Sequence, residues 1–293
     1  MHPLLGELLS SGPVVTDGAW GTQLLAAGLP PGLCPDAWNL SNPSAVETVA
    51  RAYVEAGSRV IITNTFRGNR ITLAEYGLAD QVREINRAGA AISFQAAGDR
   101  ALVFGCVGPT GKLLMMGEVS EEELRDAFLE QADALKEGGA AGIVMESMSD
   151  LEEAKVALSA ARQTGLPIVV SMAFDSGKNF DRTMMGVTPE KAAEELNDAG
   201  ADAIGANCGA GIPSYVSICQ RLRAHTARPL WIKPNAGAPE ISGGEAVYRT
   251  TPEDFARHVP LILDAGANFI GGCCGTSPGF IRAIHAVLSS SKS

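Results

Sequence analysis

Three cysteines stand at the ends of two short apolar runs of this chain. Cys208 ends one run, and the adjacent Cys273 and Cys274 end another. A glycine follows each group, as expected where a buried strand gives way to a loop. Three thiolates are the ligand set of a catalytic zinc site whose fourth position stays open. On spacing alone, packing of small side chains at crowded strand ends explains the cysteines equally well. The neighbouring glycines leave room beside the thiols and favour the metal.

The chemistry expected of such a centre is alkyl transfer to sulfur. A substrate thiol in the open position would be held as the thiolate, because the metal ion lowers a thiol pKa that is ordinarily about 8.5. The other three cysteines lack this setting, and packing or loop roles are predicted for Cys34, Cys106 and Cys219.

Two acids also follow apolar runs, Asp17 and Glu146. Such carboxylates would hold the ammonium group of a substrate through charge-assisted hydrogen bonds. A turn residue before Gly18 and a helix cap are the structural alternatives for the two acids, and the sequence does not separate them. The four histidines lie away from the strand ends, and neither glycine-rich piece matches a nucleotide-binding motif. We therefore predict no catalytic residue beyond the metal site.

The elements that must position these residues alternate along the chain. Apolar, β-rich runs cover 14–17, 59–66, 102–107, 142–146, 167–174, 203–208, 229–234 and 269–273. Segments with helical spacing cover 44–56, 80–97, 120–136, 150–164, 188–199, 213–225 and 251–264. The alternation is typical of a (β/α)8 TIM barrel or of a doubly wound open sheet, and the count of eight strands favours the barrel.

A barrel places the candidate residues at one end. Asp17, Asn64, Thr65, Glu146 and Asn235 stand at the carboxyl ends of expected strands, as do the three cysteines, and this end carries the active site in barrel enzymes. The sixth and eighth strands are separated by one neighbour, so the thiols can converge.

We expect one barrel domain over residues 1–293, with a core at about 14–288 and a low-complexity, disordered tail at 289–293. Two long connections are expected at 28–35 and 235–249.

Composition excludes several classes of function. The formal net charge of −10 and a pI near 4.9 argue against general affinity for nucleic acid or anionic membranes. The N-terminus lacks the features of a signal peptide, and no apolar stretch is long enough to span a membrane. We therefore expect a cytoplasmic protein with reduced thiols.

The motifs together resemble the homocysteine S-methyltransferases. The resemblance runs from about residue 14 to 288 and is carried by DGAWGT at 17–22, TNTF at 63–66, GANCG at 205–209, KPNAG at 233–237 and GGCCGT at 271–276. Within this family, the sequence is more similar to the homocysteine-binding module of cobalamin-dependent methionine synthase than to betaine-homocysteine methyltransferase. It implies a TIM barrel that activates homocysteine as a zinc thiolate.

The same resemblance implies roles for residues. Cys208, Cys273 and Cys274 would bind Zn²⁺, and Asp17 with Glu146 would hold the amino group of homocysteine. The substrate-binding residues implied near its carboxylate and in the pocket wall are Asn235, Ala236, Asn64 and Thr65.

The predicted function is zinc-dependent methyl transfer to homocysteine, giving methionine.

The sequence departs from the family pattern at Arg67. It stands where the methionine-synthase-like members usually carry glycine, and it adds a cation near the open end of the barrel. The sequence holds neither a folate barrel nor a cobalamin module, so we expect a small-molecule methyl donor or a methyl-corrinoid carried by a separate protein. The alternatives are transfer to another small thiol or selenol, and a non-catalytic homocysteine-binding subunit of a corrinoid methyl-transfer complex.

Overall fold

Eight parallel strands form a nearly closed barrel in the computed structural model, which describes residues 1–242 and 245–290. Their spatial order is β1-β10-β7-β6-β5-β4-β3-β2. Their bounds are β1 Val14–Val15, β2 Val60–Ile62, β3 Leu102–Val107, β4 Gly142–Met148, β5 Ile168–Met172, β6 Ala203–Cys208, β7 Leu230–Pro234 and β10 Phe269–Ile270. The amide of Arg59 donates to the carbonyl of Val15 at 2.8 Å, which joins the two ends of the sheet. The predicted TIM barrel is confirmed.

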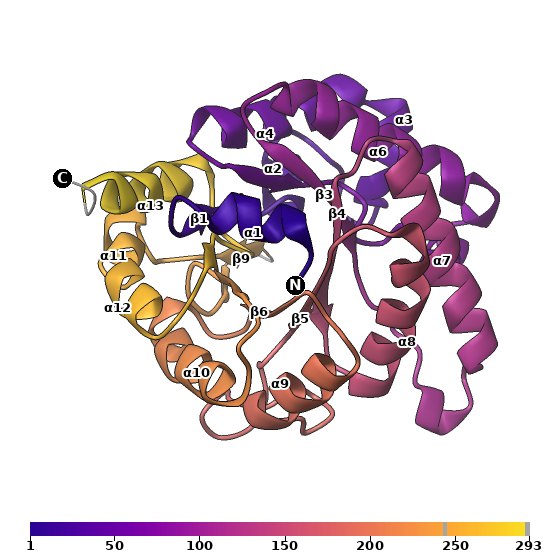
Figure 1. The fold of residues 1–293 in the computed structure, drawn as a ribbon. Coiled ribbons are helices and arrows are strands. Elements are labelled where there is room, and N and C mark those ends of the chain that lie inside the picture. The colour runs from indigo at the N-terminus through magenta and orange to yellow at the C-terminus, as the bar shows by residue number, and fades with distance from the viewer. Residues whose placement is uncertain (243–244, 291–293) are drawn as a thin grey trace.

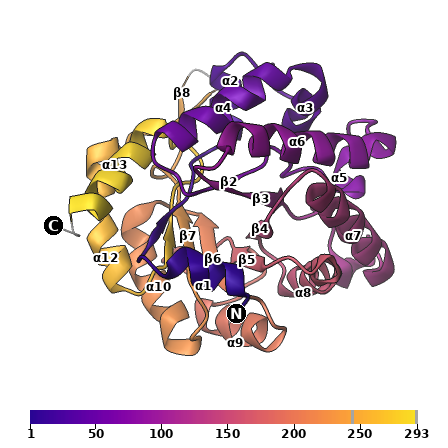
Figure 2. The ribbon, with the colours of Figure 1, turned by 45° about the horizontal axis from the view of Figure 1, so that its top comes forward.

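Helices surround the barrel, as Figure 1 and the tilted view in Figure 2 show. They are α1 Pro3–Leu9, α2 Gly21–Ala26, α3 Trp38–Ser41, α4 Pro43–Glu55, α5 Arg70–Ala74, α6 Val82–Ala97, α7 Glu121–Glu137, α8 Leu151–Ala161, α9 Pro189–Asp198, α10 Ile212–His225, α11 Pro252–Ala256, α12 Val259–Asp264 and α13 Pro278–Ser290. The start of α7 is fixed by a capping box, in which Ser120 and Glu123 satisfy each other's backbone amides. Within the described residues, no helix has both the length and the apolar character that crossing a bilayer requires.

The structure corrects three expectations from the sequence. The helix expected at 251–264 is two helices, because Pro260 has no amide hydrogen and its ring clashes with the carbonyl of Ala256, where α11 ends. The connection at 235–249 contains an antiparallel pair, β8 Glu240–Ser242 and β9 Glu245–Val247. Ser289 and Ser290 form the last turn of α13 instead of a tail, and residues 291–293 lie outside the described part.

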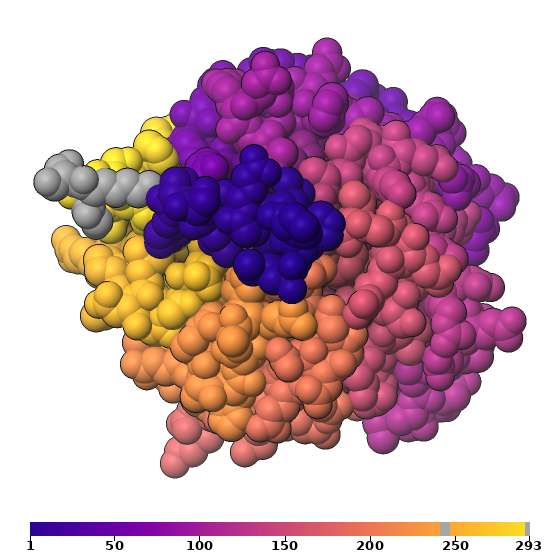
Figure 3. All heavy atoms as spheres, viewed as in Figure 1, coloured from indigo at the N-terminus to yellow at the C-terminus, as the bar shows by residue number. Residues whose placement is uncertain are grey.

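The first helix closes the end of the barrel where the strands begin. In Figures 1 and 3, α1 lies across the middle of this face. Leu5 and Leu8 of α1 are buried, and the carbonyl of Leu8 accepts a hydrogen bond from the Arg59 side chain at 3.4 Å. The opposite end, where the strands finish, is the one that can receive a ligand.

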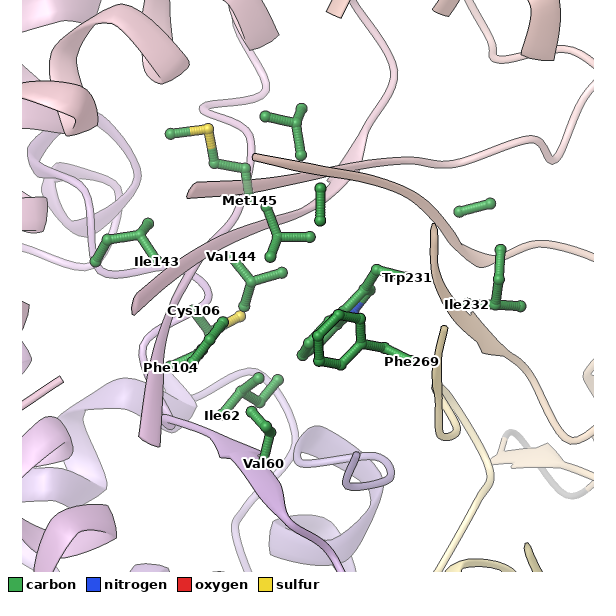
Figure 4. Close-up of a cluster of buried hydrophobic side chains, with 14 of the residues drawn as sticks. Val60, Ile62, Phe104, Cys106, Ile143, Val144, Met145, Trp231, Ile232 and Phe269 are labelled. Atoms are coloured by element: carbon green, nitrogen blue, oxygen red, sulfur yellow. The ribbon is translucent and has the colours of Figure 1, made fainter. Parts of the chain in front are cut away.

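Large side chains fill the barrel interior (Figure 4). The ring of Trp231 stacks on Phe104 with centroids 5.9 Å apart and lies 5.2 Å from the ring of Phe269. All three are fully buried. The interior is therefore a packed core, and the indole nitrogen of Trp231 extends it to Glu146 at 3.4 Å.

Truncating this core should destabilise the protein. Phe104→Ala removes a fully buried ring from the stack with Trp231, and we expect the free energy of unfolding to fall by about 3–5 kcal/mol. Urea denaturation followed by circular dichroism measures the change. Phe94→Ala is the matched control, because that ring is 58% exposed, and it should cost no more than about 0.5 kcal/mol. Equal losses in the two variants would contradict the packing described here.

Candidate active site

The three cysteine thiols converge at the open end of the barrel. Cys208 ends β6, and Cys273 and Cys274 follow β10; both strands pair with β7. The three Sγ atoms all lie within 4.8 Å of one another, and those of Cys208 and Cys273 are 3.1 Å apart. All three cysteines are free and half-buried. Hydrogen bonds from Cys208 and Cys273 lower the pKa of the Cys274 thiol below its ordinary value.

The backbone around these thiols is locally constrained. Cys208 has φ +65°, a left-handed conformation that costs a residue other than glycine about 1 kcal/mol or more. The hydroxyl of Tyr215 donates to the carbonyl of Cys208 at 2.8 Å and holds this turn. On the other loop, Thr276 donates to the carbonyl of Cys273 at 2.7 Å and accepts from the amide of Ala19 at 3.1 Å. The thiols are thus presented by fixed turns.

The buried side chain of Asn207 contacts two of the three thiols. Its side-chain amide donates to the hydroxyl of Ser147 at 2.7 Å and lies 3.5 and 3.7 Å from the sulfurs of Cys208 and Cys273. Its carbonyl oxygen accepts from the amide of Ser147 and the hydroxyl of Ser171. Sequence reasoning gave Asn207 no role, although a fully buried amide within an apolar strand is a signal for one.

A buried ion network lies beside the thiols. The ammonium of Lys233 is 2.9 Å from Asp17 Oδ1 and 3.1 Å from Glu146 Oε1, and the Lys233 side chain is 1% exposed. Burial opposes the charge of Lys233, but the two carboxylates outweigh it and raise its pKa above the ordinary value. Burial raises the pKa of Glu146, against the opposing effect of Lys233. Sequence reasoning missed Lys233, which stands in an apolar strand.

A cavity of about 330 Å³ opens beside both groups. Its walls include the three thiols, Glu146 and Lys233. The aromatic residues Trp20 and Phe66 and the charged residues Asp36 and Arg67 also line it. Arg67 therefore does bring a cation to the cavity, as its place in the sequence suggested. Its guanidinium stacks over the ring of Tyr76, with 5.8 Å to the centroid. Burial raises the pKa of Asp36 to about 7.

The predicted substrate residues fall into two groups. Glu146, Asn64 and Thr65 line the cavity. Asp17, Asn235 and Ala236 are buried and lie outside the set of described residues that line it.

Two residues of the second group, Asn235 and Ala236, stabilise the loops of the site. Asn235 donates to the carbonyl of Gly209 at 2.7 Å, and the amide of Ala236 donates to the carbonyl of Cys274 at 2.9 Å. These two residues thus tie together the loops that carry the thiols. Cys106, for which packing was predicted, is buried but also lines the cavity.

Comparison with known proteins agrees with this geometry. Methionine synthase of Mycobacterium tuberculosis (strain ATCC 25618 / H37Rv) is 32% identical over 305 residues, and that of Mycobacterium leprae (strain TN) is 32% identical over 302 residues. These matches cover 98% and 97% of this chain but 25% of each synthase, so the chain spans about a quarter of their length. The fold is similar to the metallated homocysteine methyltransferase MmuM from Escherichia coli, with a TM-score of 0.81, 23% identity and coverage of 97% of this chain and 99% of that one. The model of the homocysteine S-methyltransferase family matches residues 14–288, and the chain belongs to that family.

Proposed function

We propose that this protein transfers a methyl group to the thiol of homocysteine in a zinc-dependent reaction that gives methionine. The observation that carries the proposal is the convergence of the Cys208, Cys273 and Cys274 sulfurs within 4.8 Å at the wall of a cavity. Membership of the homocysteine S-methyltransferase family supports the same acceptor.

The residues present fit a zinc ion. Zinc–sulfur bonds of about 2.3 Å in a tetrahedral site place neighbouring sulfurs about 3.8 Å apart. The sulfurs here are separated by 3.1 Å in one pair and by no more than 4.8 Å in any pair, which brackets that spacing. Zinc bound by three thiolates supplies the positive charge that lowers the pKa of a substrate thiol in the fourth position.

The residues of the chain would do the rest. Asn207 and Ser147 would hold the thiols in place, since Asn207 donates to the Ser147 hydroxyl and that hydroxyl lies 3.3 Å from the sulfur of Cys208. Trp20 and Phe66 would give the bound acceptor apolar surface at the cavity wall. Homocysteine would lose its thiol proton to solvent on binding. Its sulfur electron pair would then form the new S–CH₃ bond as the bond between the methyl group and its donor breaks, and the departing donor would keep the electron pair of that bond. Asn64 and Thr65 would contact the bound amino acid from the cavity wall.

Metal analysis followed by a methionine-formation assay tests the proposal. The purified protein, loaded with zinc, is offered homocysteine with S-methylmethionine, S-adenosylmethionine, betaine or methylcobalamin in turn. We expect one zinc ion per chain and methionine formed with at least one donor. A protein that binds no zinc, or that forms no methionine with any donor, would contradict the proposal.

Removing one metal ligand should abolish both metal binding and activity. In Cys273→Ala we expect zinc content well below one ion per chain and a fall in methionine formation of more than about 100-fold, because two thiolates cannot replace the set of three. Inductively coupled plasma mass spectrometry and the methionine assay measure these quantities. Cys219→Ala is the control, since that buried thiol contacts the carbonyls of Ile262 and Ala265 instead. It should keep its zinc.

Removing the Asn207 side chain, which contacts two of the ligand sulfurs, should weaken zinc binding without abolishing it. Asn207→Ala deletes the amide that lies against Ser147 and two of the sulfurs, and we expect zinc affinity to fall by about 10- to 100-fold. Competition with a chromophoric chelator measures the affinity. Asn197→Ala is the control, because its contact with Thr226 is remote from the thiols, and it should leave the affinity unchanged. Wild-type affinity in Asn207→Ala would show that the ligands need no such support.

A further inference from the structure

Arg67 places a cation at the open end of the cavity that carries the thiols. Its side chain is exposed and lines the cavity together with Phe66, which is 37% exposed, and Leu25, which is 48% exposed. In the described part of the chain no acid forms an ion pair with Arg67, whereas the nearby Arg70 is paired with Glu130 at 2.6 Å. The charge of Arg67 is therefore available to a ligand.

The neighbouring carboxyl group of Asp36 does not neutralise this charge. Asp36 also lines the cavity, but its Oδ1 accepts a hydrogen bond from the backbone amide of Arg67 at 2.8 Å and not from the guanidinium. Burial raises the pKa of Asp36 to about 7, so near neutral pH this group carries only part of a negative charge. Together the two side chains leave the open end of the cavity with a net positive charge.

The guanidinium is held in a fixed position. It lies over the ring of Tyr76, 5.8 Å from the centroid, and donates one N–H to the Tyr76 hydroxyl. Buried amides fix the backbone on either side of it. Gln131 donates to the carbonyl of Thr65 at 2.8 Å, and Asn86 donates to the carbonyl of Gly68 at 2.7 Å. A guanidinium has five N–H donors in a planar fork that matches a carboxylate, so most of them remain for an anionic ligand.

The buried end of the cavity has the opposite charge. Glu146 and Lys233 lie there, and the carboxylates of Asp17 and Glu146 both face the one ammonium of Lys233. Three thiolates on a zinc ion would add a further net negative charge. A ligand that spans the cavity therefore meets negative charge at its buried end and positive charge at its open end, which complements a dipolar molecule.

We propose that Arg67 binds a carboxylate of the methyl donor, and that the donor is a small dipolar compound whose transferable methyl group is on a sulfonium or quaternary ammonium centre. The cationic centre faces the thiol cluster, and the carboxylate faces Arg67. The sulfur electron pair of the acceptor forms the S–CH₃ bond, while the donor keeps the electron pair of the broken bond and its cationic centre becomes a neutral thioether or amine. Arg67 is then a residue that determines donor specificity. The inference rests on the proposed function and narrows its donor to one chemical class.

Matched pairs of donors test this inference. Betaine is compared with choline, in which a hydroxymethyl group replaces the carboxylate, and S-methylmethionine is compared with (3-aminopropyl)dimethylsulfonium, which lacks the carboxylate. Methionine formation by the zinc-loaded protein at saturating homocysteine gives kcat/KM for each donor. We expect wild type to prefer the carboxylated member of at least one pair by about 10-fold or more. Wild type that accepts both members of each pair equally, or that uses methylcobalamin and neither carboxylated donor, would overturn the inference.

Variants assign the preference to Arg67. Arg67→Gln should lose it, because KM for the carboxylated donor rises about 10-fold while kcat changes little. Arg67→Lys keeps the charge without the planar fork and should retain part of the preference. Arg70→Gln is the matched control, since that guanidinium is paired with Glu130 and does not line this cavity, and it should behave as wild type does.

Calorimetry without the acceptor separates this inference from the proposed function. Zinc-loaded wild type and Arg67→Gln are titrated with betaine and with S-methylmethionine in the absence of homocysteine, so that no methyl transfer occurs. If wild type binds one of them about 10-fold more tightly than the variant but forms no methionine with any donor, the proposed function fails and anion recognition by Arg67 stands. Equal KM values in the two proteins, or equal affinities in a protein without turnover, would show that Arg67 does not bind the carboxylate.

Discussion

The fold and the site both depend on the buried carboxylate of Asp17. Asp17 follows β1, and its Oδ2 accepts a hydrogen bond from the backbone amide of Ile62 in β2. In a regular sheet a backbone carbonyl of the neighbouring strand would accept this bond. The other carboxylate oxygen of Asp17 holds Lys233 of β7, which in turn reaches Glu146 of β4. This side chain thus adds to the hydrogen bond between Arg59 and Val15 that joins the two ends of the sheet, and it fixes the charged groups of the cavity. A buried charge is tolerated only when it is paired and hydrogen-bonded, so these features are energetically coupled.

The thiol cluster depends on the barrel in a comparable way. Strands β6 and β10 flank β7, so the parallel register brings Cys208 near Cys273 and Cys274. The register does not determine the direction of the sulfurs. The left-handed conformation of Cys208 does so, together with the hydrogen bonds that Tyr215 and Thr276 donate to the carbonyls of the two loops. The side-chain amide of Asn207 also contacts the sulfur of Cys208. Backbone strain at Cys208 is retained because several contacts hold it from different elements.

The sequence predicts the strands, the ring order and the meeting of the thiols, because these follow from apolar runs and from the geometry of a closed barrel. It does not predict which way a polar side chain points at a strand end. Asp17 was expected at the mouth of the barrel, but it is fully buried, and its carboxylate accepts hydrogen bonds from Trp20, Ile62 and Lys233, which line the cavity in its place. Lys233 and Asn207 were missed because their partners come from strands far apart in the sequence.

The ion network holds the fold only as a complete set. Removing one of Asp17, Lys233 and Glu146 would leave an uncompensated buried charge, which destabilises strongly, whereas replacing all three with well-packed apolar residues is often neutral or stabilising. Burying these charges therefore brings the fold no clear net gain over an apolar core. Two of the three residues, Lys233 and Glu146, line the cavity, and two carboxylates against one ammonium leave one net negative charge there. We therefore attribute the network to the electrostatics of the cavity and not to the packing of the barrel.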